Sequence, residues 1–168
     1  MTRVERAKPH KTAAERLTVD NRSNSFLQPT LVERLLNRSL GALVRLGIGP
    51  AHMFLLAVRG RRSGRVYSTP VDLLVVGDKV YLVAPRGSTQ WTRNAAASGE
   101  VTLRRGRHAT QYGVRVQSDA EKPPILRAYL DRFRREVQRF FPVSAGSPAE
   151  AFLPLSPQYP VFELLPKC

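Results

Sequence analysis

The sequence predicts a mainly β domain of the α+β class, a small barrel or half-open barrel of about six antiparallel strands with helices inserted between them. Three observations lead to this prediction. Short apolar runs rich in β-branched residues recur from residue 53 onward, and glycine-containing turns separate them at hairpin spacing. The length of 168 residues suits a single core, and no internal repeat divides it.

Two segments precede the predicted barrel strands. Residues 1–29 are polar and charged, which predicts a basic flexible arm outside a domain of residues 30–168. Over residues 31–46, apolar side chains recur at three- and four-residue steps and arginines occupy the other face, which predicts an amphipathic helix. Such a helix either packs on the domain's own core or lies on a membrane surface or a partner.

The expected strands lie at residues 53–58, 66–76, 79–84, 100–105, 108–117 and 160–165. The first is apolar on both faces, as in the wall of a barrel. Gly77-Asp78 and Gly106-Arg107 supply the turns of two hairpins. These spacings make neighbouring strands antiparallel.

The segments between the strands predict two further helices. A short helix is expected at residues 91–97, with Ser88 or Thr89 as its N-cap. A longer one is expected at residues 125–140, where Pro123-Pro124 suits the first turn. Residues 142–157 contain four prolines, and we expect no regular structure there.

The charge of the chain predicts an anionic partner. Lys and Arg number 27 against 13 Asp and Glu, a formal net charge of +14, and most of the cations are arginine. Arginine pairs with phosphate or carboxylate through a planar fork. A phosphorylated cofactor, an anionic membrane face and nucleic acid all suit such a surface. Nucleic acid is disfavoured, since the strands lack interleaved aromatic residues for base stacking.

The sequence predicts a cytoplasmic location, because it shows no secretory signal and no apolar run near the ~20 residues that cross a bilayer. Peripheral contact with the inner membrane face, through the arm and residues 31–46, stays open as an alternative. The single cysteine, Cys168, excludes an intrachain disulfide.

The most distinctive motif is the loop of residues 59–65, between the first two predicted strands. Four arginines, two glycines and Ser63 are crowded into these seven residues. The like charges repel unless an anion compensates them, and a cradle of backbone N–H groups and guanidinium forks would hold a phosphate. A solvated loop whose arginines point apart explains the motif equally well.

A second motif, residues 84–94, combines a strand end, a glycine turn and a helix start, which is typical of an anion site. Trp91 either stacks on a planar ring there or packs in the core. No metal-ligand spacing and no nucleophile or acid–base pair is visible, so the catalytic residues stay unknown and no metal is expected. Asp72 lies mid-strand, either half-buried or at the barrel rim. If the protein is an enzyme, the simplest interpretation is that a bound cofactor transfers a hydride, because such a reaction needs no nucleophile or acid–base pair from the protein.

The order of these motifs resembles the deazaflavin-dependent nitroreductase family over roughly residues 50–165. The segments that carry the resemblance are Gly60-Arg61-Arg62-Ser63-Gly64, Thr69-Pro70-Val71, Ala84-Pro85-Arg86-Gly87 and Trp91-Thr92-Arg93-Asn94. The resemblance implies a split β-barrel, FMN-binding-like, that binds coenzyme F420. It also implies hydride transfer from the reduced deazaflavin to a small organic acceptor, either a quinone, an activated alkene or a nitro compound. A homodimer is a further expectation.

The resemblance also implies which residues bind the cofactor. They are Arg61, Arg62, Ser63 and Gly64 at the phosphate and tail, Thr69, Pro70 and Val71 at the ring, Ala84, Pro85, Arg86 and Gly87 on the phosphate side, and Trp91 and Asn94 shaping the pocket. Thr92 stands where the family usually has an aromatic residue, and the tyrosine-rich helix of nitro-reducing members has no counterpart. The alternatives are an FMN-binding reductase of the same fold and a non-catalytic basic module that binds anionic membrane or nucleic acid.

Overall fold

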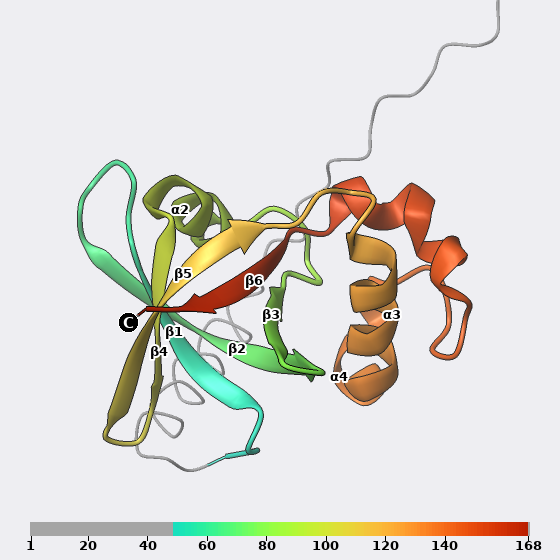
Figure 1. Ribbon diagram of the computed structural model, residues 1–168, viewed down its shortest axis with the longest axis horizontal. Coiled ribbons are helices and arrows are strands. Elements are labelled where there is room, and N and C mark those ends of the chain that lie inside the picture. Colours follow the sequence, from blue (N-terminus) through green and yellow to red (C-terminus); the bar gives the residue numbers. More distant parts are fainter. Residues whose placement is uncertain (1–48, 168) are drawn as a thin grey trace, which may run out of the picture.

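The computed structural model describes residues 49–167. The arm of residues 1–29 and the helix expected at residues 31–46 lie outside the described residues. The strands are β1 (Met53–Arg59), β2 (Val66–Val76), β3 (Lys79–Val83), β4 (Glu100–Arg105), β5 (His108–Val116) and β6 (Val161–Pro166). They form a closed antiparallel barrel in the order β1-β2-β3-β6-β5-β4 (Figure 1). The predicted fold class, a mainly β barrel with inserted helices, is confirmed.

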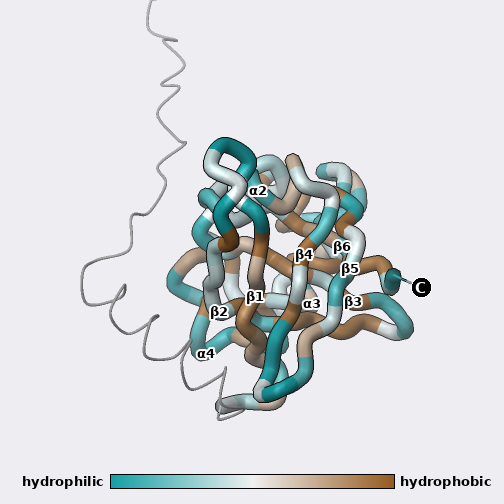
Figure 2. Tube along the Cα trace, turned by 90° about the vertical axis from the view of Figure 1, so that its left-hand side faces the viewer, coloured by the Kyte–Doolittle hydropathy of each residue, from teal (hydrophilic) through white to brown (hydrophobic). Residues whose placement is uncertain are grey.

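Two hairpin turns appear where the sequence predicts them. Gly77 (φ 62°) begins the turn between β2 and β3, and Gly106 (φ 56°) begins the turn between β4 and β5. Both backbones lie in the left-handed region, which glycine enters without steric cost. In Figure 2 much of the strand length is hydrophobic, whereas the turns at the strand ends are hydrophilic.

Strands β3 and β6 bury both of their faces. Leu82 and Phe162 point into the barrel, whereas their neighbours Val83 and Val161 belong to a second apolar cluster outside it. Side chains alternate between the two faces of a strand, so each of these strands lies between two cores. The inner core is made of Leu56, Val58, Leu82, Ala95, Val101, Leu103, Phe162 and Leu164.

Helix α2 (Gln90–Ser98) closes one end of the barrel and contacts β1, β4 and β5. Thr89 is its N-cap residue, and the Thr92 hydroxyl accepts a hydrogen bond from the Thr89 backbone N–H at 2.9 Å. The helix ends at Gly99, whose φ of 69° is left-handed. The predicted short helix is therefore confirmed, with one more residue at each end.

The long helix predicted at residues 125–140 is wrong as a single element. Helix α3 (Lys122–Arg132) ends at Phe133, where φ and ψ are −115° and 26°, and α4 (Arg134–Val137) and the 3₁₀ turn η1 (Gln138–Phe140) follow. Phe133 and Val137 are both buried in the outer core, as the apolar pattern predicts. Periodicity gave the buried face correctly, but packing against the barrel redirects the backbone at Phe133.

The prediction of no regular structure in residues 142–157 is also wrong in part. A 3₁₀ helix, η2 (Ala149–Gln158), forms there and includes Pro154 and Pro157. The structure places η2 against α3, as Figure 1 shows. Phe152 is fully buried in the outer core, so its packing outweighs the poor helix propensity of the prolines.

A polar network fastens the outer face of β6 to β5. Glu163 is buried and accepts hydrogen bonds from Arg115 Nε at 2.9 Å and Nη2 at 2.6 Å. Lys79 Nζ lies 3.3 Å from the other carboxylate oxygen. The Arg115 hydrogen bond is the main reason why the pKa of Glu163 is lowered. The carboxylate is thus compensated on both sides, as a buried charge requires.

Replacing Phe152 with Ala should destabilise the protein by about 3–5 kcal/mol, because it leaves a cavity between η2 and α3. Chemical denaturation with matched m-values measures the change. Leu153→Ala is the control, since Leu153 is 56% exposed and its loss should cost no more than about 0.5 kcal/mol. Equal losses for the two variants would show that η2 is not held by Phe152.

Candidate functional site

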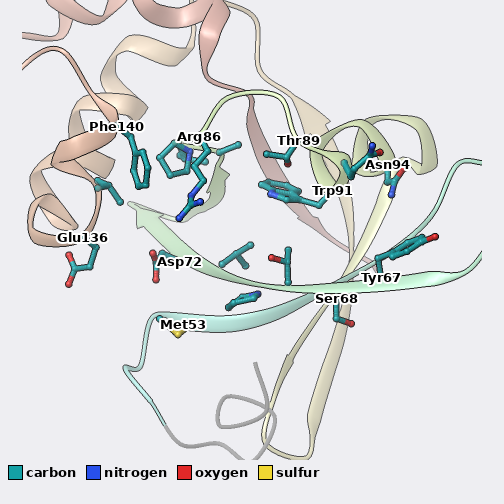
Figure 3. Close-up of a pocket in the computed structure, with 18 of the residues that line it drawn as sticks. Met53, Tyr67, Ser68, Asp72, Arg86, Thr89, Trp91, Asn94, Glu136 and Phe140 are labelled. Carbon is teal, nitrogen blue, oxygen red and sulfur yellow. The ribbon is translucent and has the colours of Figure 1, made fainter. Parts of the chain in front are cut away.

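A cleft of about 1140 Å³ runs along β2, between the start of α2 and the turns that follow α3 (Figure 3). Residues 67–72 of β2 form its floor. Residues 83–86, at the end of β3, and the first residues of α2 line one side. The other end is lined by Tyr129 of α3 and by residues 135–140. The cleft lies where the outer helical layer stops covering β2.

The arginine loop, residues 59–65, is held tightly at one end of the cleft. The Gly60 N–H donates to the Arg65 carbonyl at 2.7 Å, and the Gly64 N–H donates to the Gly60 carbonyl at 2.8 Å. The Tyr67 ring covers Gly60, so that a Cβ there would lie 2.5 Å from a ring carbon. Only glycine fits under this ring without a shift, which explains Gly60 in the loop.

Asn94 of α2 fastens the arginine loop to the rest of the site. Its Oδ1 atom accepts a hydrogen bond from the Arg61 backbone N–H at 3.3 Å and one from Arg61 Nη1 at 2.9 Å. Arg61 Nη1 also donates to Gln90 Oε1 at 3.2 Å. The loop is therefore prearranged, and the positive Arg61 side chain is fixed beside the first turn of α2.

Arg62 differs from Arg61, because it makes no hydrogen bond or ion pair with any other residue of the described range 49–167. It is exposed and lines the cleft. A cation without a carboxylate partner is free to pair with an anion that enters the cleft. This end of the cleft therefore has the charge and the donors of an anion site.

The N-terminus of α2 adds to this end of the cleft. The Thr89 hydroxyl oxygen is buried and has no hydrogen-bond partner among the described residues. Trp91 lines the cleft and packs against Phe162 of the barrel core, with ring centroids 5.6 Å apart. The interpretation of Trp91 as a core-packing residue is therefore confirmed, and its stacking on a planar ring in the cleft stays a prediction.

The opposite end of the cleft is more aromatic. Phe140 lies between two guanidinium groups, with Arg86 5.0 Å and Arg139 4.7 Å from its ring centroid. Met53 and Val137 line the same end. Figure 3 shows Arg86 and Phe140 facing one another above β2. This end of the cleft therefore combines an aromatic ring and apolar side chains with the guanidinium groups of Arg86 and Arg139.

Asp72 is the unusual side chain of this end. Its Oδ1 atom is buried and has no hydrogen-bond partner among residues 49–167, and it lies 3.6 Å from His52 Nε2. Burial raises the pKa of Asp72; the positive charge of His52 opposes this shift, and the negative charge of Glu136 adds to it. Asp72 lines the cleft, so an ionisable group with a raised pKa faces bound molecules.

The structure brings together almost all of the residues that the resemblance implies. Arg61, Arg62, Ser63, Thr69, Pro70, Val71, Ala84, Pro85, Arg86, Trp91 and Asn94 all line the cleft. Arg86, which the resemblance implies on the phosphate side, lies beside Phe140 at the end away from the arginine loop (Figure 3). Gly64 and Gly87 do not line the cleft but shape the chain beside it, with φ values of 68° and 79°. A Cβ on Gly87 would also lie 3.3 Å from the Gln158 carbonyl oxygen.

Sequence reasoning missed the far wall of the cleft. This wall comes from Tyr129, Arg135, Glu136, Arg139 and Phe140. No local motif marks these residues, because the break at Phe133 determines where they lie. Asp72 could have been recognised from the sequence as a candidate site residue, because a carboxylate is unusual in an otherwise apolar strand.

The sequence matches the family model described as F420H(2)-dependent quinone reductase over residues 31–139. The chain belongs to this family. The resemblance to deazaflavin-dependent enzymes is thereby confirmed, and the protein is an F420H2-dependent oxidoreductase. Coenzyme F420, and not the FMN alternative, is the cofactor that the family uses. No curated protein matches the sequence.

Comparison with solved structures finds several distant likenesses. One, described as an F420-H2 dependent reductase (FDR-A), is 17% identical, with 68% of this chain and 94% of that chain covered and a TM-score of 0.47. A putative pyridoxamine 5'-phosphate oxidase from Listeria innocua is 12% identical over 79% of this chain and 94% of its own, with a TM-score of 0.47. HutZ, a heme storage protein from Vibrio cholerae, is 11% identical over 70% and 82%, with a TM-score of 0.48. At these scores the likenesses carry no functional argument.

The residues of the cleft fit the cofactor of the family. F420 has a phosphate and a carboxylate tail, and the arginine loop offers them prearranged cations. Arg61 is fixed for this role by its hydrogen bonds to Asn94 Oδ1, and Arg62 is exposed beside it. Between residues 49 and 167, no group of His, Cys, Asp and Glu side chains could hold a metal ion.

Other expectations stay predictions for this family member. No helix within the described range is long and apolar enough to cross a membrane. The peripheral membrane contact was assigned to residues 1–29 and 31–46, which lie outside that range. The homodimer and the cytoplasmic location are not tested by the geometry of the site.

Replacing Asp72 with Asn should raise the Tm of the protein at about pH 8. The pKa of Asp72 is raised in the folded state, so that state holds the proton more tightly than the unfolded chain does. Stability therefore falls as pH rises from the ordinary pKa of 3.8 through the folded pKa, and Asn carries no such penalty. Thermal scans at several pH values should show the difference between variant and wild type narrowing toward acid pH. The exposed carboxylate of Asp78 is the control, and Asp78→Asn should show no such pattern.

Proposed function

We propose that the cleft along β2 binds F420, with the anionic part of the cofactor at the arginine loop. The observation that supports this most directly is Arg61, fixed by Asn94 beside the N-terminus of α2, with Arg62 exposed next to it. Arginine forks and helix N-termini both favour phosphate and carboxylate groups. The loop therefore provides charge and position for a phosphate and its tail.

The middle of the cleft suits the ring system of the cofactor. Thr69, Pro70 and Val71 line its floor, and Trp91 borders it. Ala84 and Pro85 line the side of β3, while Arg86 leads toward the opposite end. When bound in reduced form, F420 supplies a hydride. The protein's own residues orient the ring and exclude water from it.

We propose further that the acceptor is a quinone that binds beside Phe140. The Phe140 ring and the apolar side chains of Met53 and Val137 suit a flat molecule. The arginines of the same end, Arg86, Arg135 and Arg139, can donate hydrogen bonds to its carbonyl oxygens. The name of the family points to the same class of acceptor. Activated alkenes and nitro compounds are flat as well, and they form the comparison set for the test.

Replacing Arg62 with Ala should raise the dissociation constant of F420 at least tenfold. A charge-assisted hydrogen bond contributes about 1.5–3 kcal/mol, and 1.4 kcal/mol corresponds to about a factor of ten. Trp91 is the only tryptophan and lines the cleft, so quenching of its fluorescence reports binding. Arg107→Ala removes the same charge from the exposed turn between β4 and β5 and should leave the constant within about twofold.

An unchanged constant in Arg62→Ala would contradict the placement of the anion at the arginine loop. Equal weakening by Arg107→Ala would mean that the net charge of the protein, and not this loop, attracts the cofactor. Absence of saturable quenching in the wild type would contradict F420 binding itself.

Replacing Phe140 with Ala should raise the KM for menadione, a simple quinone, about tenfold while the F420 dissociation constant stays unchanged. Stacking of the Phe140 ring on the quinone should contribute about 0.5–1.5 kcal/mol to the free energy of binding, in addition to the effect of the buried area. Steady-state kinetics with saturating reduced F420 measure the KM. If KM is unchanged, or if a nitro compound or an activated alkene is reduced far better than menadione by the wild type, the quinone assignment is wrong.

A further inference from the structure

A quinone that becomes a hydroquinone takes up a proton as well as a hydride, and the cleft holds a carboxyl group placed to provide the proton. Asp72 lies on β2 opposite Met53 of β1, at the end of the cleft away from the arginine loop. Figure 3 shows its side chain rising from β2 into the space below Arg86 and Phe140, with Glu136 to its side. The proposed acceptor site is the same space.

Burial and unmet hydrogen bonding distinguish Asp72 from the other carboxyl groups around it. Its side chain is 19% exposed, and Oδ1 is buried without a hydrogen-bond partner among the described residues. A carboxylate in that position lacks the donors that it would have in water. A protonated carboxyl group suits the position better, since it has no charge to solvate. Burial raises the pKa of Asp72 accordingly.

Every element around Asp72 contributes an ionisable group. His52 precedes β1, Tyr129 comes from α3 and Glu136 from α4, while the cations Arg86, Arg135 and Arg139 line the same end of the cleft. Tyr129 is a poorer proton donor, because burial and the charges of Asp72 and Glu136 raise its pKa well above the ordinary value. Glu136 is exposed to solvent. Asp72 is thus the acid best suited to donate.

We propose that Asp72 is the catalytic acid that protonates the acceptor, an inference that rests on the proposed function of the cleft. A quinone accepts two electrons and one hydrogen as hydride from the reduced cofactor, which is oxidised. The O–H bond of the Asp72 carboxyl group breaks, and its proton forms the O–H bond of the hydroquinone. Asp72 is left as a carboxylate. The proton that the reduced cofactor loses along with its hydride passes to solvent, and solvent returns one proton to Asp72, so atoms and charge balance over the cycle.

His52 gives the carboxylate a route back to the protonated form. Its Nε2 atom lies 3.6 Å from Asp72 Oδ1, and its side chain is 29% exposed. It stands behind Asp72 and not in the lining of the cleft, packed against Phe133 with ring centroids 4.9 Å apart. A proton from solvent can therefore reach Asp72 while the cleft is filled. His52 acts as a positioning and relay residue in this scheme.

The test compares the wild type, Asp72→Asn and Asp78→Asn with reduced F420 and menadione over a range of pH. In the wild type, kcat/KM should fall as pH rises through the pKa of Asp72, because only the protonated acid donates. Asp72→Asn should lower kcat/KM by about 100-fold on the acid side and remove this pH dependence. Asp78 lies in an exposed turn, so Asp78→Asn should keep the wild-type kcat/KM and its pH dependence.

Two readouts are independent of turnover. In the protein without cofactor, carbon NMR of labelled aspartate should show one carboxyl group, absent from Asp72→Asn, that titrates above the ordinary value of 3.8. The F420 dissociation constant of Asp72→Asn, from Trp91 quenching, should match that of the wild type. These measurements separate loss of the acid from loss of the cofactor or of the fold.

The possible failures are distinguishable. An Asp72→Asn variant that keeps the wild-type rate and pH profile would overturn the role of Asp72 alone, and so would an Asp72 carboxyl group that titrates at or below 3.8. A wild type that fails to bind F420, or that binds it without reducing menadione, would overturn the proposed function. A variant that loses activity together with F420 binding would show that Asp72 supports the cofactor site and is no proton donor.

Discussion

The architecture depends on strands that are buried on both faces. A six-stranded barrel encloses a small core, so β3 and β6 also pack outward against α3 and η2, and this second core is the larger of the two. Covering one side of the barrel with helices leaves the rest of its wall open. The floor of the cleft, residues 67–72 of β2, lies where this cover stops. The cleft is thus a consequence of how far the outer layer reaches, and any change that shifts α3 or α4 moves its far wall.

The strands and turns of this fold could be predicted because their signals are local. Glycines such as Gly77 and Gly106 occupy left-handed backbone positions, and the apolar runs between them have the length of strands. The break at Phe133 and the 3₁₀ helix around Phe152 could not be predicted in the same way. Helical periodicity continues past Phe133, and prolines argue against a helix near Phe152; in both places contacts with distant parts of the chain outweigh the local preference.

The candidate site, too, has one part that local sequence signals predict and one part that depends on tertiary contacts. Its near wall comes from motifs that are contiguous in sequence, and the order of those motifs was enough to name most of the lining residues. Its far wall comes from the turns after α3, whose position depends on tertiary packing. The two walls also differ in chemistry, since one presents a cationic loop fastened by Asn94 and the other presents Phe140, Asp72 and Glu136. In the function proposed for this cleft, binding of the cofactor and binding of the acceptor depend on different segments of the chain, which can vary independently.

Closure of the barrel limits how two copies of this protein can associate. β1 pairs with β2 on one side and with β4 on the other, so the ring of strands in the described part of the chain has no free edge. An unpaired edge is the usual template for joining sheets of neighbouring molecules. Without one, residues 49–167 can join a second copy only through side-chain surfaces, as long as every strand pairing of the barrel is kept. Such an interface can change its sequence, and with it its partner, while the hydrogen bonding that holds the barrel together stays the same.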